Sequence, residues 1–231
     1  MVAENYKRIL NDISDVCKNT GREPGSVRLI AVSKTKPVED LMEAYNAGAR
    51  DFGENYVQEL SEKIPQMPED VRWHMIGHLQ RNKVKYLIGK VFLIHSVDSL
   101  RLAEEISKES VKAGVTTNIL LEVNASGEDS KWGGSLDETI ELVGKAAKLP
   151  GIAIKGLMTV APYTENAEDN RKYFRALKQL SVDIEGRFED NISMDALSMG
   201  MTGDYRVAIE EGATYIRVGT AIFGARDYSN N

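Results

Sequence analysis

The chain has 231 residues, of which 42% are hydrophobic, and its 29 basic and 35 acidic side chains give a formal net charge of -6. This length and composition can bury a full core, arranged as one large domain or two small ones. The acidic balance argues against a protein that binds nucleic acid through bulk electrostatics. The single cysteine, Cys17, excludes an intrachain disulfide and fits a reducing compartment.

The N-terminal stretch is charged and carries no long apolar run, so it does not have the pattern of a signal peptide. No apolar run in the sequence approaches the length that a membrane-spanning helix needs. The sequence therefore predicts a cytoplasmic protein, and we expect a monomer without a membrane or nucleic-acid partner.

Short apolar runs alternate with longer amphipathic stretches along the chain. A leading helix is predicted over residues 5–17. The apolar runs predict strands that begin near Val27, Ala49, Arg72, Val91, Thr116, Ile152, Ser193 and Thr214. The second and seventh of these are weak by pattern alone. Helical patterns fall between the strands, over residues 38–47, 80–88, 100–113, 136–149 and 167–184.

Eight strand–helix units in about 200 residues match a (β/α)₈ TIM barrel, and the alternation of strands with helices implies parallel pairing. An open, doubly wound sheet is the alternative. The leading helix would precede the first strand and cover the barrel. No linker, low-complexity segment or change in composition interrupts the chain, so we expect a single domain over residues 1–231.

Three segments that are distant in sequence would meet at one end of such a barrel. Lys34 follows the apolar run of residues 29–33 and is followed by Pro37, which is the pattern of a buried strand that ends in an amine. Residues 198–204 (SMGMTGD) and 217–220 (RVGT) follow the predicted seventh and eighth strands. In this fold the functional groups sit at the carboxyl ends of the strands, and the loops after strands seven and eight most often bind phosphate.

The residue types in these segments suit an anion beside an amine. Gly200 and Gly219 let backbone N–H groups approach a phosphate closely, and Ser198 and Thr220 can donate hydroxyl hydrogen bonds. A desolvated lysine with a phosphate cradle is what pyridoxal 5'-phosphate (PLP) requires, since PLP needs an amine for its aldehyde and donors for its phosphate. Composition and spacing alone support only a phosphate-binding barrel.

Neighbouring polar residues allow more than one interpretation. Thr202 is a good N-cap for a helix whose positive end would face the phosphate, and Asp204 is then expected to point away. Asn55 follows the second strand and could touch the cofactor or cap a helix. Lys36 has the same side-chain parity as Lys34 and could be a backup amine or, more simply, a solvated loop lysine.

His74 and His78 are four residues apart, the spacing that suits a metal on one face of a helix. Gly77 and the strand pattern over residues 73–76 argue against a helix there. We therefore expect structural roles for both histidines and no metal site.

Six segments, in order, carry a resemblance to a known family. They are residues 31–37 (AVSKTKP), 52–59 (FGENYVQE), 73–83 (WHMIGHLQRNK), 156–159 (GLMT), 197–202 (LSMGMT) and 216–224 (IRVGTAIFG). The chain resembles the pyridoxal phosphate homeostasis protein family over nearly its whole length, and residues 73–83 are especially family-specific. This resemblance implies the barrel domain of alanine racemase standing alone. It also implies a role in intracellular PLP homeostasis as a cofactor reservoir or carrier for PLP-dependent client enzymes, without robust catalysis.

The resemblance also assigns roles to individual residues. It implies that PLP forms a Schiff base with Lys34 and that Arg217 faces the pyridine nitrogen. It implies a phosphate cradle made of Ser198, Gly200, Gly219 and Thr220. Lys131 stands where racemases carry an arginine, and it could reach the phenolic oxygen of the cofactor or act as a second amine.

One departure from alanine racemase separates a carrier from an enzyme. That enzyme has a second β-domain, whose tyrosine acts as a base on the opposite face of the cofactor. The present sequence ends at Asn231, directly after the predicted barrel, so we expect no such domain. Racemisation needs an acid and a base on opposite faces. A carrier is therefore expected, with a fold-type III PLP enzyme such as a small amino-acid racemase as the alternative, and a PLP-free phosphate-binding barrel as a third interpretation.

Overall fold

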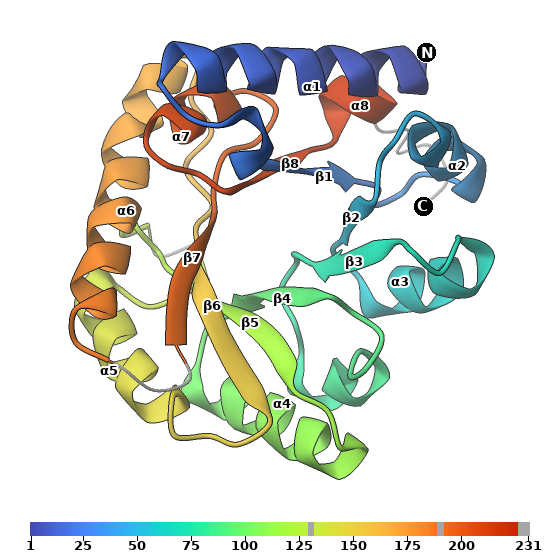
Figure 1. The fold of residues 1–231 in the computed structure, drawn as a ribbon. Helices are drawn as coiled ribbons and strands as arrows, with labels where there is room; N and C mark the ends of the chain where they lie inside the picture. Colours follow the sequence, from blue (N-terminus) through green and yellow to red (C-terminus); the bar gives the residue numbers. More distant parts are fainter. Residues whose placement is uncertain (129–131, 189–191, 226–231) are drawn as a thin grey trace.

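A closed barrel of eight parallel strands forms the centre of the molecule (Figure 1). The computed structural model describes residues 1–128, 132–188 and 192–225. The strands are β1 (Arg28–Val32), β2 (Asp51–Glu54), β3 (Arg72–Met75), β4 (Leu93–Val97), β5 (Thr117–Glu122), β6 (Ile152–Met158), β7 (Ile192–Ser198) and β8 (Tyr215–Val218). They follow chain order around the barrel, and β8 pairs with β1 to close it. The predicted single-domain (β/α)₈ barrel is confirmed, and the open sheet is wrong.

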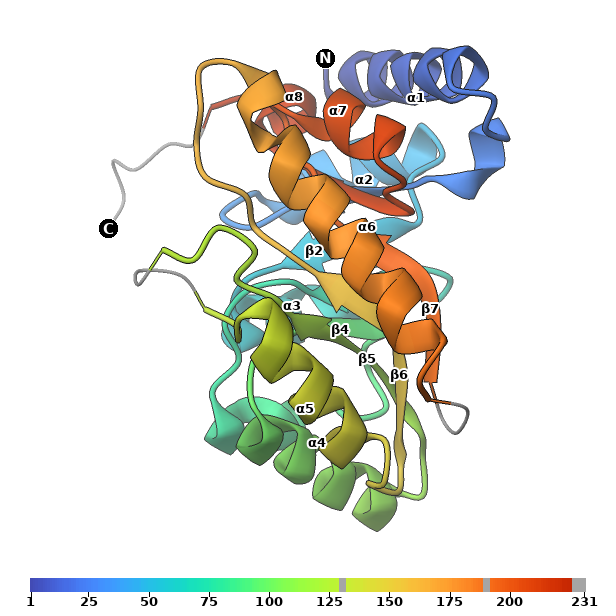
Figure 2. The same cartoon turned by 90° about the vertical axis from the view of Figure 1, so that its left-hand side faces the viewer.

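Helices surround the barrel, as Figures 1 and 2 show. The α-helices are α1 (Val2–Asn19), α2 (Val38–Asn46), α3 (Val57–Lys63), α4 (Leu100–Ala113), α5 (Leu136–Ala146), α6 (Arg171–Glu185), α7 (Tyr205–Glu210) and α8 (Thr220–Phe223). Short 3-10 helices are η1 (Pro24–Ser26), η2 (Ile64–Gln66), η3 (Arg81–Tyr86) and η4 (Ala167–Asn170). The pattern over residues 80–88 thus gives a 3-10 helix. Among the described residues no helix is both long and apolar enough to cross a membrane.

Helix α1 lies across α7 and α8 and covers that side of the barrel (Figure 1). Its buried residues are Val2, Tyr6, Ile9, Ile13 and Cys17. They recur every three or four positions, so they share one face of the helix. The leading helix predicted from the sequence is confirmed, and Cys17 lies on its buried face.

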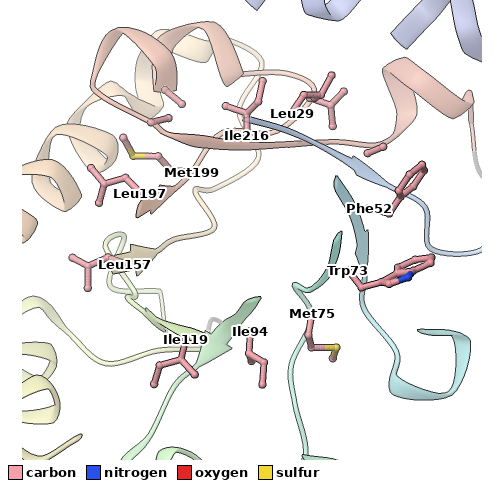
Figure 3. Packing of buried hydrophobic residues seen from close by; sticks show 14 of the residues in the cluster. Leu29, Phe52, Trp73, Met75, Ile94, Ile119, Leu157, Leu197, Met199 and Ile216 are labelled. Atoms are coloured by element: carbon pink, nitrogen blue, oxygen red, sulfur yellow. The ribbon is translucent and has the colours of Figure 1, made fainter. Parts of the chain in front are cut away.

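Alternate residues along each strand face opposite sides of the sheet. Residues such as Leu29, Trp73 and Ile119 point outward and form the apolar layer beneath the helices (Figure 3). A second, smaller apolar cluster comprises Leu93, Leu120, Met158 and Ala196 from the opposite faces of β4 to β7. Polar side chains of the same inward parity occupy the rest of the barrel interior, and they lead to the functional site.

Candidate functional site

A cavity of about 520 Å³ opens at the carboxyl ends of the strands. Strand β1 ends at Val32, and Lys34 lies half-buried in the turn before α2. The predicted site residues that line the cavity are Lys34, Asn55, Arg217, Gly219 and Thr220. The structure therefore brings together residues from the loops after β1, β2 and β8, as the barrel topology requires.

Two other predicted site residues lie elsewhere. Ser198 and Gly200 are buried, and neither is among the residues that line this cavity. The Ser198 hydroxyl lies within the barrel, where it contacts Arg217 and His95. Lys131 lies outside the described residues.

Arg217 is buried and forms part of the cavity wall. Its Nη1 donates to the Ser198 hydroxyl at 2.6 Å, and its Nη2 donates to the Thr159 carbonyl at 2.9 Å. Burial lowers the pKa of Arg217 to about 10, so the guanidinium is still charged at neutral pH. The side chain is held at a fixed place as an obligate donor.

A chain of four hydrogen bonds leads from Arg217 through the barrel interior, and all four run in one direction. Arg217 can only donate and an ionised Asp51 can only accept. The Ser198 hydroxyl must therefore donate to His95 Nδ1, His95 Nε2 to His74 Nδ1, and His74 Nε2 to Asp51, each at 2.9 Å. Burial lowers the pKa of both His74 and His95, which agrees with the neutral imidazoles that this direction requires. The only proton of the Ser198 hydroxyl is thus engaged inside the barrel.

Asp51, the last acceptor in this chain of hydrogen bonds, carries a negative charge. Burial by itself would raise the pKa of Asp51, but hydrogen bonds from Arg72 and His74 hold it well below its usual range. Arg72 Nε donates to Asp51 Oδ1 at 2.8 Å. The carboxylate is therefore ionised and fixes the direction of the chain.

The loop after β7 differs from the prediction at two residues. Helix α7 begins at Tyr205 with Asp204 as its N-cap, so the prediction of Thr202 as the N-cap is wrong. Asp204 lines the cavity instead of pointing away. Its Oδ1 accepts from the Met201 N–H at 2.7 Å and its Oδ2 accepts from the Asn170 amide at 2.8 Å. The carboxylate therefore holds this loop through two neutral donors, directly before α7 begins.

Asn55 lies directly after β2 and lines the cavity. The N-cap of α3 is Tyr56, so the alternative that Asn55 caps a helix is wrong. A Cβ at Gly77 would lie 2.5 Å from the carbonyl oxygen of Asn55 and 2.6 Å from its Cα. Only glycine lets the turn after β3 approach this closely, which explains why Gly77 stands in the segment 73–83.

Lys36 faces away from the cavity and holds the end of α8. Its Nζ donates to the carbonyl oxygens of Phe223 at 3.0 Å and Ala225 at 2.9 Å. Neither the backup amine nor the solvated lysine describes this arrangement. A lysine near a helix C-terminus commonly satisfies carbonyls that the helix leaves without partners.

The two histidines of residues 73–83 have separate surroundings. His74 lies inside the barrel, whereas His78 stacks on Trp132 with ring centroids 3.7 Å apart and has its Nδ1 3.3 Å from Asp98. Across the described residues, no cluster of His, Cys, Asp and Glu could hold a metal ion.

Sequence reasoning missed two polar residues near Arg217. His95 is one, and Glu122 at the end of β5 is the other. Burial first, and the nearby Asp98 second, raise the pKa of Glu122 to about 7, while Arg217 opposes the shift. The available signal was a polar side chain inside an otherwise apolar strand, because such a residue needs a buried partner.

The chemistry of the cavity fits PLP. Its size falls within the usual range for small-molecule sites, roughly 300–1,000 Å³. Lys34 offers an amine and Arg217 a charged donor. Thr220 offers a hydroxyl, and the adjacent Gly219 lines the cavity without a side chain. The lining carboxylate of Asp204 is already engaged by Met201 and Asn170. Donors therefore face the cavity of a protein whose net charge is negative.

Comparison with known proteins agrees with this fit. Residues 6–227 match the family model described as alanine racemase, N-terminal domain. A protein of Aquifex aeolicus named pyridoxal phosphate homeostasis protein is 45% identical over 226 residues, covering 97% of this chain and 98% of the relative. The structure of PipY from Synechococcus elongatus with PLP bound has a TM-score of 0.82 at 32% identity and covers 97% of this chain and 100% of that one. An alanine racemase from Clostridium difficile has a TM-score of 0.76 at 14% identity, covering 98% of this chain and 58% of the racemase, which shows a shared fold.

Proposed function

This chain belongs to the pyridoxal phosphate homeostasis protein family, within the wider family of the alanine racemase N-terminal domain, and on that basis we propose that it binds PLP as an intracellular reservoir or carrier. The barrel over residues 1–231 is the PLP-binding unit of this proposal. The observation that carries it is that Lys34, from the loop after β1, and Arg217, from β8, line the same cavity. A relative of matching length bears the homeostasis name, and the similar PipY has been seen with PLP bound.

Most of the proposed contacts use residues that line the cavity. PLP, when bound, supplies an aldehyde that reacts reversibly with amines, and Lys34 supplies the amine. Thr220 and the backbone around Gly219 bind the phosphate, and Gly200 supports them from the neighbouring loop after β7, where its carbonyl accepts from the Arg217 N–H. Asn55 contacts the cofactor from the turn after β2, and Lys131 is proposed to reach its phenolic oxygen or to act as a second amine. Ser198 is proposed to act at the phosphate only through the loop that follows it, because its hydroxyl is engaged with Arg217 and His95 and its carbonyl accepts from the Thr159 N–H.

Arg217 supports a carrier over an efficient enzyme. Its guanidinium remains charged and can only donate, so a ring nitrogen that faces it acts as an acceptor. A pyridine ring without a proton withdraws electrons weakly, which disfavours chemistry on amino acids. The buried contacts to Ser198 and Thr159 hold the guanidinium in this role. PLP-dependent client enzymes in the cytoplasm are the proposed receivers, and the carrier itself is proposed to be monomeric.

The test begins with the absorption spectrum of the purified protein before and after addition of PLP. Borohydride reduction and peptide mass mapping should then place the phosphopyridoxyl group on Lys34, and Lys34→Ala should lose the covalent link but keep the fold. Lys36→Ala is the matched control. A label mainly on Lys36 or Lys131 would contradict the assignment, and a protein that stays colourless with PLP would contradict the function.

Activity is tested separately by incubating the PLP-loaded protein with L-alanine and resolving the enantiomers. We expect no appreciable racemisation. Turnover at ordinary enzyme rates, on the order of 1 per second or more, would favour the racemase alternative.

A further inference from the structure

Behind the barrel wall, Lys63 at the end of α3 is buried and makes three hydrogen bonds. Its Nζ donates to the Ser33 carbonyl at 2.8 Å, to Glu54 Oε1 at 2.8 Å and to Glu59 Oε1 at 2.6 Å. An ammonium group has three N–H donors. All three are used here, so the side chain is charged and fixed in place.

The same cluster binds the residues on both sides of Lys34. The Ser33 hydroxyl donates to Glu54 Oε1 at 2.6 Å, and the Thr35 N–H donates to Glu59 Oε1 at 2.5 Å. With the bond from Lys63 to the Ser33 carbonyl, the backbone is anchored immediately before and immediately after Lys34. The cluster of Lys63, Glu54 and Glu59 is hereafter called the lysine network.

The backbone that the lysine network holds is strained. Thr35 has a φ of 62°, in the left-handed region that a β-branched residue rarely adopts. Such a conformation persists where the surrounding contacts impose it, and it is common at functional sites. The bond from the Thr35 N–H to Glu59 is a contact that stabilises this conformation.

Stability alone does not account for the lysine network. It places two carboxyl groups and one ammonium largely out of water. Burial raises the pKa of Glu54 to about 7 although Lys63 opposes the shift, and Glu54 Oε2 is buried without a hydrogen-bond partner. Apolar residues of similar volume are often as stabilising as a buried ion pair or more so. The arrangement is directed at the turn that carries Lys34, which points to a role in placing that residue.

We propose that Lys63 and Glu59 are positioning residues for Lys34, which hold its backbone so that its amine faces the cavity when PLP binds. The inference rests on the proposed function. In the reaction, the Lys34 nitrogen forms a C=N bond to the aldehyde carbon of PLP, and the aldehyde oxygen leaves as water. Neither Lys63 nor Glu59 exchanges a proton with the reacting atoms.

The experiment compares two ligands in Glu59→Ala. The rate of C=N formation is followed by stopped-flow absorbance after mixing with PLP. The affinity for pyridoxine 5'-phosphate, which has an alcohol in place of the aldehyde, measures binding without the covalent step. We expect the covalent step to slow about tenfold, because small displacements of a reacting group cost that much or more. Affinity for pyridoxine 5'-phosphate should be unchanged.

Three further variants sharpen the test. Glu59→Gln retains an acceptor for the Thr35 N–H and should restore most of the rate. Glu59→Asp keeps the charge beside Lys63 but shortens the reach to Thr35, so it should be slow and gives the same test if Glu59→Ala does not fold. Glu62→Ala changes an exposed carboxylate on the same helix and should match the wild type.

The outcomes separate this inference from the proposed function. If the wild type forms no covalent link with PLP, the proposed function fails. If the wild type forms the link and both Glu59→Ala and Glu59→Asp do so at the same rate, the positioning role is overturned. Equal losses of affinity for PLP and for pyridoxine 5'-phosphate would also overturn it, because they would reveal a general effect on the fold.

Discussion

Two polar networks support the cavity, one at Lys34 and one at Arg217, and they are built differently. The lysine network lies outside the barrel wall and forms hydrogen bonds with the backbone on both sides of Lys34. The chain of Arg217, Ser198, His95, His74 and Asp51, called here the arginine network, lies inside the barrel. It holds a side chain rather than a backbone segment.

The difference follows from what each network supports. Lys34 is the residue proposed to react, and the lysine network holds the backbone before and after it. Arg217 only donates, so its side chain can be fixed directly. The lysine network packs Lys63 directly against Glu59 and against Glu54, whose pKa burial raises to about 7, whereas the arginine network separates its two charged ends by neutral groups. Breaking the first should therefore cost more stability than breaking the second.

The largest effect is expected from Lys63→Met, which leaves Glu54 and Glu59 without their cation. Removing one partner of a buried pair typically costs about 3–5 kcal/mol in the free energy of unfolding. Urea unfolding of the PLP-free protein at pH 7 measures the loss. Lys112→Met, at an exposed lysine that pairs with Glu109, is the control and should cost less than about 1 kcal/mol. A loss for Lys63→Met as small as that of the control would contradict the comparison.

Glu122 beside Arg217 should make stability depend on pH. Its pKa is raised in the folded protein to about 7. The contribution of Glu122 to the free energy of unfolding is therefore fully present below the unfolded pKa near 4.5 and is lost as pH rises toward 7. Glu122→Gln removes this loss. The stability of Glu122→Gln relative to wild type should therefore increase from pH 5 to pH 8, by up to about 3 kcal/mol. Urea unfolding across this range measures it, and a difference independent of pH would show that Glu122 titrates normally.

His95→Phe should interrupt the arginine network while keeping most of the volume. It leaves the Ser198 hydroxyl and His74 Nδ1 without their partner, at a cost of roughly 1–3 kcal/mol. Thermal unfolding is the measurement, and His78→Phe, at a partly exposed ring stacked on Trp132, is the control. If the two variants lose equal stability, the interior chain is not the feature that stabilises the barrel.

The smallest effect is expected from Lys36→Met, which tests whether Lys36 lies outside the set of residues that position Lys34. Lys36 holds the end of α8 and not the cavity, so its loss removes two hydrogen bonds worth about 1 kcal/mol each. The covalent link with PLP should form at the wild-type rate. Slower formation would mean that Lys36 belongs to the site after all.

Much of the fold could be predicted from the sequence because its signals are local. Apolar runs and amphipathic periods depend on neighbouring residues, and they placed all eight strands close to their observed starts. In a parallel barrel the carboxyl ends of the strands meet at one mouth. The sequence alone therefore predicted that Lys34, Arg217, Gly219 and Thr220 lie at one mouth, and all four line the same cavity.

The tertiary structure decided how side chains pair across the barrel. The contact between Ser198 and His95 joins residues 103 positions apart, and the bond from Lys63 to the Ser33 carbonyl spans 30 positions. Such contacts depend on strand register and helix placement, which no local pattern encodes. For this reason the sequence identified Lys34 and Arg217, while only the structure revealed the networks that hold them.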